Sequence, residues 1–305
     1  MQDDYGKLRQ FNHVHSDGRQ LFTACIELML IYESRVALSD SSEGLRHAYD
    51  VMVEPIRDRV NYYSIEESVR RKKIKQSAFE LAPYSLEHSH SDGTLDGITQ
   101  ITLLRGENED DQSDLFFDWY DSDDGYIRLG LPIEEVMANP EDYLALCLDA
   151  AAELPFQLGM AGFSMNYEDI YINGNEHLAD PIIGRFPGVN VVHAGFYRGI
   201  SDGLPTVNWL TLVRSELVER LGGLAKLKSQ EGDGVVVHPL RHGVAVQAGP
   251  RPLLGDVNAQ ESLAPYYRVG EMLAPVRTRS ELESGIRGSR AEATEWGHRF
   301  FGSAP

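Results

Sequence analysis

The sequence has few cysteines, which limits the kinds of site that it can hold. Cys25 and Cys147 stand alone, with no CxxC spacing in the 305 residues. A disulfide scaffold needs several cysteines, and structural zinc sites typically use closely spaced ones. We therefore expect neither of them, and a chain of this length can instead bury a substantial hydrophobic core.

Long hydrophobic runs are also missing. The most apolar stretch, LFTACIELMLIY at 21–32, is interrupted by polar residues and is shorter than the roughly 18 apolar residues of a membrane-spanning helix. The N-terminus, MQDDYGKLRQFNHV, lacks the basic start and apolar core of a secretory signal. We expect a cytoplasmic protein that does not enter a membrane.

Basic residues are scarce in one part of the chain. The net charge of the whole sequence is −19, and residues 80–150 carry 18 acidic residues against only Arg105 and Arg128, a net charge of −16. Proteins that bind DNA, RNA or anionic membranes carry the opposite charge on their binding surface. We therefore expect no direct contact with nucleic acid, and a partner that carries positive charge.

The acidic residues concentrate in the stretch 107–124, ENEDDQSDLFFDWYDSDD. Half of its 18 residues are acidic, none is basic, and the aromatic block LFFDWY lies inside it. Aligning Gly125 with the glycine of an EF-hand loop places Tyr120 at the first ligand position and Leu131 at the twelfth, so the stretch fails as a calcium loop of this kind.

An accessible aromatic within an acidic surface is typical of a protein-binding patch, because the ring supplies affinity and the charges supply selectivity. A solvated acidic face without a partner is the alternative, and the sequence does not decide whether LFFDWY points inward or outward. The predicted partner-binding residues are Glu107, Glu109, Asp110, Asp111, Asp114, Asp118, Trp119, Tyr120, Asp121, Asp123 and Asp124.

Strand and helix signals come in mixed order without repeating βαβ units, which predicts an α+β fold of antiparallel meanders and hairpins packed with helices. A meander is expected over 97–131, with a turn at Asp124-Gly125, and a hairpin over 234–249. We expect helices over 42–62, from 139 to 154 with Asn139 as the cap, over 207–221 and within 262–276. Residues 1–285 are expected to form one globular unit, and residues 286–305 a loosely packed tail.

Enzyme-like patterns are weak. HVHSDG and HSHSDG place His13, His15, His88 and His90 in the His-x-His spacing that metal-dependent hydrolases use, and this is the alternative function. The other histidines do not fall in known ligand spacings. Ser164 in GFSMN lacks the second glycine of a nucleophile elbow and is expected to be a packed strand or turn residue. We therefore expect no catalytic site and no cofactor.

Several stretches resemble the type VI secretion immunity family of TsiV/TsiT-type proteins, which protect a bacterium against antibacterial effectors. They are LGLP at 129–132, PEDY at 140–143, GMAGF at 159–163, VNWLT at 207–211 and, most specifically, GVAVQAGPRPLLGDVN at 243–258. The resemblance covers residues 86–277. It implies a cognate effector toxin as partner and no catalytic residues. Together with the acidic segment, it leads us to expect a basic toxin, a nuclease, whose substrate groove must hold phosphates.

Overall fold

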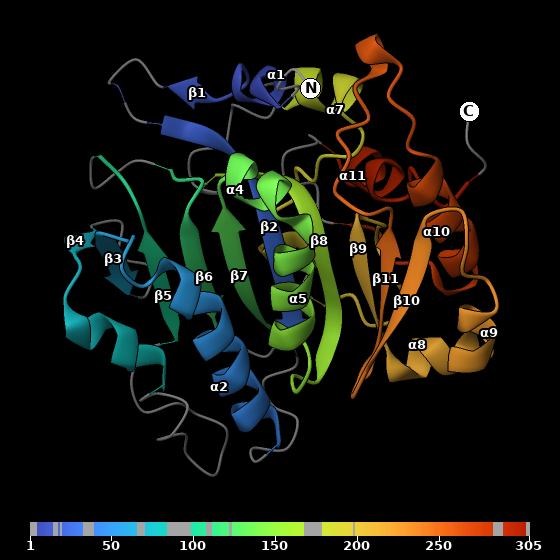
Figure 1. Ribbon diagram of the computed structural model, residues 1–305, viewed down its shortest axis with the longest axis horizontal. Coiled ribbons are helices and arrows are strands. Elements are labelled where there is room, and N and C mark those ends of the chain that lie inside the picture. The colour runs from blue at the N-terminus through green and yellow to red at the C-terminus, as the bar shows by residue number, and fades with distance from the viewer. Residues whose placement is uncertain are drawn as a thin grey trace.

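The computed structural model describes residues 5–14, 18, 20–32, 40–65, 71–83, 99–107, 112–121, 124–167, 179–197, 199–282 and 289–302. In these residues the strands form an eleven-stranded sheet with the order β10-β11-β9-β8-β2-β7-β6-β5-β3-β4, and β1 pairs with β2 off this path (Figure 1). The strands are β1 (His13–Val14), β2 (Gln20–Tyr32), β3 (Tyr62–Ile65), β4 (Lys72–Lys73), β5 (Gln100–Leu104), β6 (Phe116–Tyr120), β7 (Gly125–Leu131), β8 (Phe156–Asn166), β9 (Leu210–Arg214), β10 (Val235–Leu240) and β11 (Gly243–Ala248).

Helices accompany this sheet and give the α+β architecture that the sequence predicted. The α-helices are α1 (Gly6–Arg9), α2 (Asp40–Val53), α4 (Ile133–Ala138), α5 (Pro140–Ala150), α7 (Asp180–Arg185), α8 (Ser215–Arg220), α9 (Leu224–Lys228), α10 (Ala264–Leu273) and α11 (Arg290–Gly297). Short 3-10 helices are η1 (Glu54–Ile56), η2 (Gln76–Glu80), η4 (Ala194–Tyr197), η5 (Val257–Ala259) and η6 (Ala274–Val276). Figure 1 shows α2, α4 and α5 in front of the sheet.

Strand β2 is the centre of the sheet. It pairs antiparallel with β7 on one side and with β8 on the other, and its residues from Leu21 to Tyr32 are all buried. A strand covered on both faces reads as a nearly continuous apolar run rather than an alternating one. This explains the run at 21–32, in which Glu27 is the one ionisable acid and is itself only 4% exposed.

The predicted meander at 97–131 is confirmed as β5, β6 and β7, and the predicted hairpin at 234–249 as β10 and β11. The ring of Phe117 on β6 meets Tyr49 of α2 edge to face, with 5.2 Å between the ring centroids. Helix α2 is followed by the 3-10 turn η1, which contains Pro55. The helix expected over 42–62 is therefore shorter than predicted, because proline cannot continue the hydrogen-bond ladder.

Two local predictions were wrong, and a third is confirmed only in part. Residues 210–214 form strand β9 between β8 and β11, and only 215–220 are helical, so tertiary pairing overrides the helical spacing of the apolar residues. Asn139 occupies the N-cap position of α5 as predicted, but its side chain makes no capping hydrogen bond there. The expected loose tail instead contains α11, and Phe300 after it is fully buried.

Candidate functional site

Strand β6 separates the described residues of the acidic stretch into two groups. Glu107 and Asp114 precede the strand, whereas Asp121 and Asp124 follow it. The strand has five residues and spans roughly 13 Å, at about 3.3 Å per residue. These described acids therefore do not form one continuous patch, because they lie at opposite ends of β6.

Two residues predicted to bind a partner lie inside the protein. Trp119 is 1% exposed, and its Nε1 donates a hydrogen bond to the hydroxyl of Tyr32 at 2.8 Å. Asp118 is 6% exposed and accepts a hydrogen bond from the hydroxyl of Thr102 at 3.0 Å. Both faces of β6 are covered here, so the alternation of LFFDWY does not expose an aromatic anchor at Trp119. The LFFDWY block points mainly into the core.

The other acids of the stretch are closer to solvent. Asp114 pairs with Arg105 at 2.8 Å, Asp121 accepts a hydrogen bond from Tyr32, and Asp124 accepts one from Gln157. Tyr120 is half-buried and stacks on Tyr126, with 5.5 Å between the ring centroids. Glu107 is exposed. Glu109, Asp110, Asp111 and Asp123 lie outside the described residues.

Side-chain hydrogen bonds hold both ends of the connection between β5 and β6, and we call these two ends its base. On the outgoing side, the amide side chain of Asn61 accepts from the backbone nitrogen of Gly106 at 2.9 Å and donates to its carbonyl at 2.8 Å. On the returning side, Gln112 and Ser113 are buried, and the side chain of Asn166 donates to the carbonyl of Ser113 at 3.0 Å. Thr23 donates to the carbonyl of Gln112 at 3.2 Å, which adds a second anchor.

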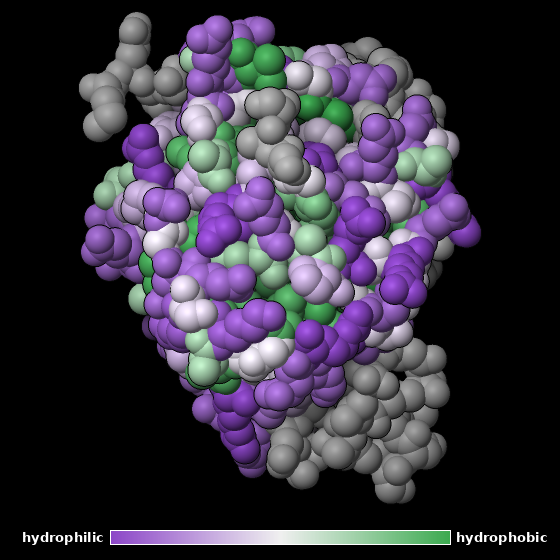
Figure 2. All heavy atoms as spheres, turned by 90° about the vertical axis from the view of Figure 1, so that its right-hand side faces the viewer, coloured by the Kyte–Doolittle hydropathy of each residue, from purple (hydrophilic) through white to green (hydrophobic). Residues whose placement is uncertain are grey.

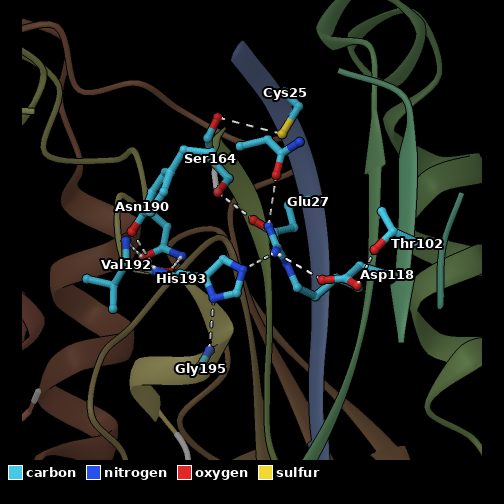
Figure 3. A network of polar contacts seen from close by, with 12 residues as sticks. Cys25, Glu27, Thr102, Asp118, Ser164, Asn190, Val192, His193 and Gly195 are labelled. Atoms are coloured by element: carbon cyan, nitrogen blue, oxygen red, sulfur yellow. Dashed lines mark hydrogen bonds and ion pairs between the residues drawn. The ribbon is translucent and has the colours of Figure 1, made fainter. Parts of the chain in front are cut away.

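Asn166 links this base to a buried polar network centred on Arg128. Figure 3 labels Glu27, Asp118 and His193 of this network. The Arg128 guanidinium, 3% exposed, donates to Glu27 at 2.5 Å and to Asn166 at 3.2 Å, and lies 3.5 Å from Asp118. Its Nη1 also lies 2.5 Å from Nε2 of His193. Because a guanidinium only donates, this ring nitrogen must act as the acceptor.

Burial and the arginine act in opposite directions on the acids of this network. Burial raises the pKa of Asp118, and the positive charge of Arg128 partly offsets that increase. The second oxygen of Glu27 accepts a hydrogen bond from the Ser164 hydroxyl at 2.5 Å. Ser164 is a buried strand residue, as the sequence predicted. The network can therefore orient neighbouring strands, but its groups are already engaged with one another.

Two features of the sequence point to this network. Glu27 is a lone acid inside the apolar run 21–32, and Arg128 is one of two basic residues in a 71-residue acidic segment. Charged residues are almost never fully buried unless they are paired. A lone acid and a lone base on predicted core strands could thus have been proposed as partners. Nothing in the sequence placed Asn166 between them.

The histidines of the alternative hydrolase site are mostly outside the described residues. The backbone of His13 lies in the two-residue strand β1, whereas His15, His88 and His90 fall outside the description. Within the described ranges, no group of three or more His, Cys, Asp or Glu residues is arranged to hold a metal ion. Over the same ranges, no helix is long and apolar enough to cross a membrane.

Comparison with known proteins adds a family to this geometry. A family model described as TsiV, type VI immunity for VRR-NUC, matches residues 101–300. The chain belongs to this family. The matched residues extend from β5 to Phe300 and include the Arg128 network apart from Glu27 on β2, so the resemblance found in the sequence is confirmed.

Solved structures show the same fold. The chain is similar to the Pseudomonas aeruginosa T6SS protein PA0821, with a TM-score of 0.79 and 20% sequence identity, over 97% of this chain and 89% of that chain. At this identity the similarity concerns the fold alone. No curated protein matches the sequence.

Proposed function

We propose that this TsiV-family chain binds and neutralises a nuclease effector of the VRR-NUC class in the cytoplasm. The observation that carries the proposal is the family match over 101–300, whose description couples type VI immunity with VRR-NUC. The acidic segment supports it independently. A nuclease needs a positively charged groove to hold phosphates, and a surface with net negative charge can occupy or cover such a groove.

The ion pairs show which described acids remain unpaired near the connection between β5 and β6, which we call the β5–β6 end. Asp114 is paired with Arg105, Glu135 with Arg59, and Glu134 with Arg9. Exposed Glu107 makes no ion pair with any residue that the structure describes. Among the described acids at this end, Glu107 is thus the one without an ion pair, and we propose Glu107 and the neighbouring acids at 109–111 in the sequence as the main contact.

The proposed contact also includes the acids at the other end of β6. They are Asp121, Asp123 and Asp124, with Tyr120 beside them. Asp114 belongs to the β5–β6 end, and Asp118 and Trp119 would act through the core that supports both ends. Charge reversal at each end separately distinguishes the two groups.

The fixed base of the β5–β6 connection favours a binding role for it. Asn61 and Asn166 hold its two sides, so fewer backbone torsions need to be ordered when a partner binds. Ordering of loops and side chains is a main cost of association. A connection held in this way presents its charges at a lower entropic cost than a free acidic spacer.

The buried state of the nucleophilic side chains favours an inhibitor over an enzyme. Burial raises the pKa of both Cys25 and Cys147, which keeps the two thiols protonated and unreactive. The hydroxyl of Ser164 is buried and engaged with Glu27. We propose that the chain acts by binding alone.

The test is to titrate a purified VRR-NUC effector with this chain and to measure DNA cleavage and binding. We expect stoichiometric inhibition and an association rate that falls as salt concentration rises, because charge steers the encounter. Exposed ion pairs contribute only about 0–1 kcal/mol each, so tight binding would also need buried contacts on the partner side. Cleavage that is unchanged at a molar excess of the chain would refute the proposal.

A further inference from the structure

Strand β10 lies at an edge of the sheet, where its outer side could accept another strand. In the described residues β11 is its one strand neighbour, and the pairing runs from Val235 opposite Ala248 to Leu240 opposite Gly243. Successive residues of an antiparallel strand direct their backbone groups to alternate sides. Residues 236, 238 and 240 therefore bond to β11, whereas 235, 237 and 239 direct their backbone groups outward.

The outward positions of β10 offer no free N–H donor. The nitrogen of Val235 donates to the carbonyl of Gly232 at 2.9 Å. The nitrogen of Val237 donates to the Glu231 carboxylate at 2.8 Å. Position 239 is proline, which has no N–H. A strand placed alongside would thus find no donors for its own carbonyls, and the Val235 carbonyl already accepts from the nitrogen of Gly232 at 3.2 Å.

Glu231 is held in the position that closes this edge. It follows α9, whose Lys228 binds the same carboxylate at 2.9 Å. The turn after it contains Gly232, Asp233 and Gly234, all with positive φ, and returns the chain directly into β10. Lys228 and the backbone nitrogen of Val237 lower the pKa of Glu231, so the carboxylate stays charged at neutral pH.

Strand β10 also carries exposed hydrophobic surface, which would favour pairing with another chain if the edge were open. Val236 of β10 is 41% exposed. Figure 2 faces this side of the molecule, and hydrophilic side chains predominate there with smaller hydrophobic areas between them. Exposed edge strands with apolar residues are templates for pairing with another chain unless charges, prolines or other devices block them.

We propose that Glu231 and Pro239 together close the β10 edge against strand addition by a second copy of this chain. The opposite edge is protected differently, because β4 has only two residues and both are exposed lysines, Lys72 and Lys73. In the described part of the chain, both ends of the strand order are therefore poorly suited to pairing with a second copy. This inference does not depend on the identity of the effector.

The experiment compares the unmodified chain with E231Q, E231A and the double variant E231A/P239V by sedimentation velocity over a range of protein concentrations. Glutamine keeps an oxygen that can accept from Val237, so E231Q should sediment as the unmodified chain does. The double variant exposes two donors and should associate further as concentration rises. Adding Val236→Lys to the double variant should abolish that association, because a charge on the edge opposes pairing.

Amide exchange at Val237 keeps the proposal testable if the double variant does not fold. The exchange rate should rise roughly fivefold or more in E231A relative to E231Q, because only alanine removes the acceptor. Equal exchange rates in the two single variants would overturn the proposal. So would a folded double variant that sediments as the unmodified chain does at every concentration.

Discussion

Replacement of Arg128 by methionine tests whether the buried network supports the fold. Arg128 contacts Glu27 at 2.5 Å and Asn166 at 3.2 Å, and its charge faces Asp118 at 3.5 Å. Methionine replaces the apolar part of the arginine side chain but is shorter and has no charge and no donor. The change therefore leaves two carboxylates, 4% and 6% exposed, without their cation.

The expected loss is large for a single substitution. Removing one partner of a buried ion pair costs about 3–5 kcal/mol, because the remaining charge stays buried without compensation. Arg105→Met is the matched control, since Arg105 is the other basic residue of the acidic segment and its pair with Asp114 is exposed. That control should lose no more than about 1 kcal/mol. Urea unfolding followed by tryptophan fluorescence gives both values.

The loss of stability in Arg128→Met should also depend on pH. Burial already raises the pKa of Asp118, and loss of the Arg128 charge raises it further. A carboxyl whose folded pKa lies above its unfolded value favours folding below the unfolded pKa, and that contribution is lost as pH rises through the folded pKa. The deficit of Arg128→Met relative to the unmodified chain should therefore be smaller at pH 5 than at pH 7.5. A deficit below about 1 kcal/mol at pH 7.5, or one that does not change with pH, would refute the reasoning.

Three further predictions concern packing and charge. Trp119→Ala should lower the free energy of unfolding by about 3–5 kcal/mol in urea titrations, because a buried ring is removed; a change in effector off-rate without this loss would contradict its place in the core. Asp110→Lys with Asp111→Lys should slow association with the effector at low salt and leave the thermal midpoint nearly unchanged, as stopped-flow and calorimetry can show. Gly270→Ala should destabilise the chain by about 1–3 kcal/mol, because its Cβ would lie 1.7 Å from a backbone oxygen after α11, whereas Gly184→Ala, with open space around it, should not.

The sequence predicted the elements whose signals were local. The Asp124-Gly125 turn, the hairpin at 234–249 and the apolar run at 21–32 each carry their own turn residues or strand formers. These were enough for the antiparallel α+β class. The order of strands in the sheet needed contacts between distant residues, such as Ile26 opposite Leu131 and Phe163, that no local pattern contains.

Sheet packing explains two places where the structure departs from the local sequence pattern. Leu210 and Val213 fit the spacing of a helix face, yet β9 is flanked by β8 and β11 and both side chains are fully buried there. Trp119 sits among acids in the sequence, which suggested exposure, yet its position on a covered strand decides its burial. Net charge describes a whole segment, whereas the burial of a side chain depends on how the strand that carries it is packed.

The structure also changes how the acidic segment can act. Acids adjacent in sequence are separated by β6 into two ends of the sheet, and those nearest to Arg105, Arg59 and Arg9 are paired within the chain. Because these acids lie at two ends of β6, we propose that the β5–β6 connection, which includes exposed Glu107, forms the main steering surface. Its base is joined through Asn166 to Arg128, whose own charge is neutralised inside the core by Glu27 and Asp118. One of the two basic residues of the segment is thus kept away from the surface, which strengthens the negative field that a basic effector would meet.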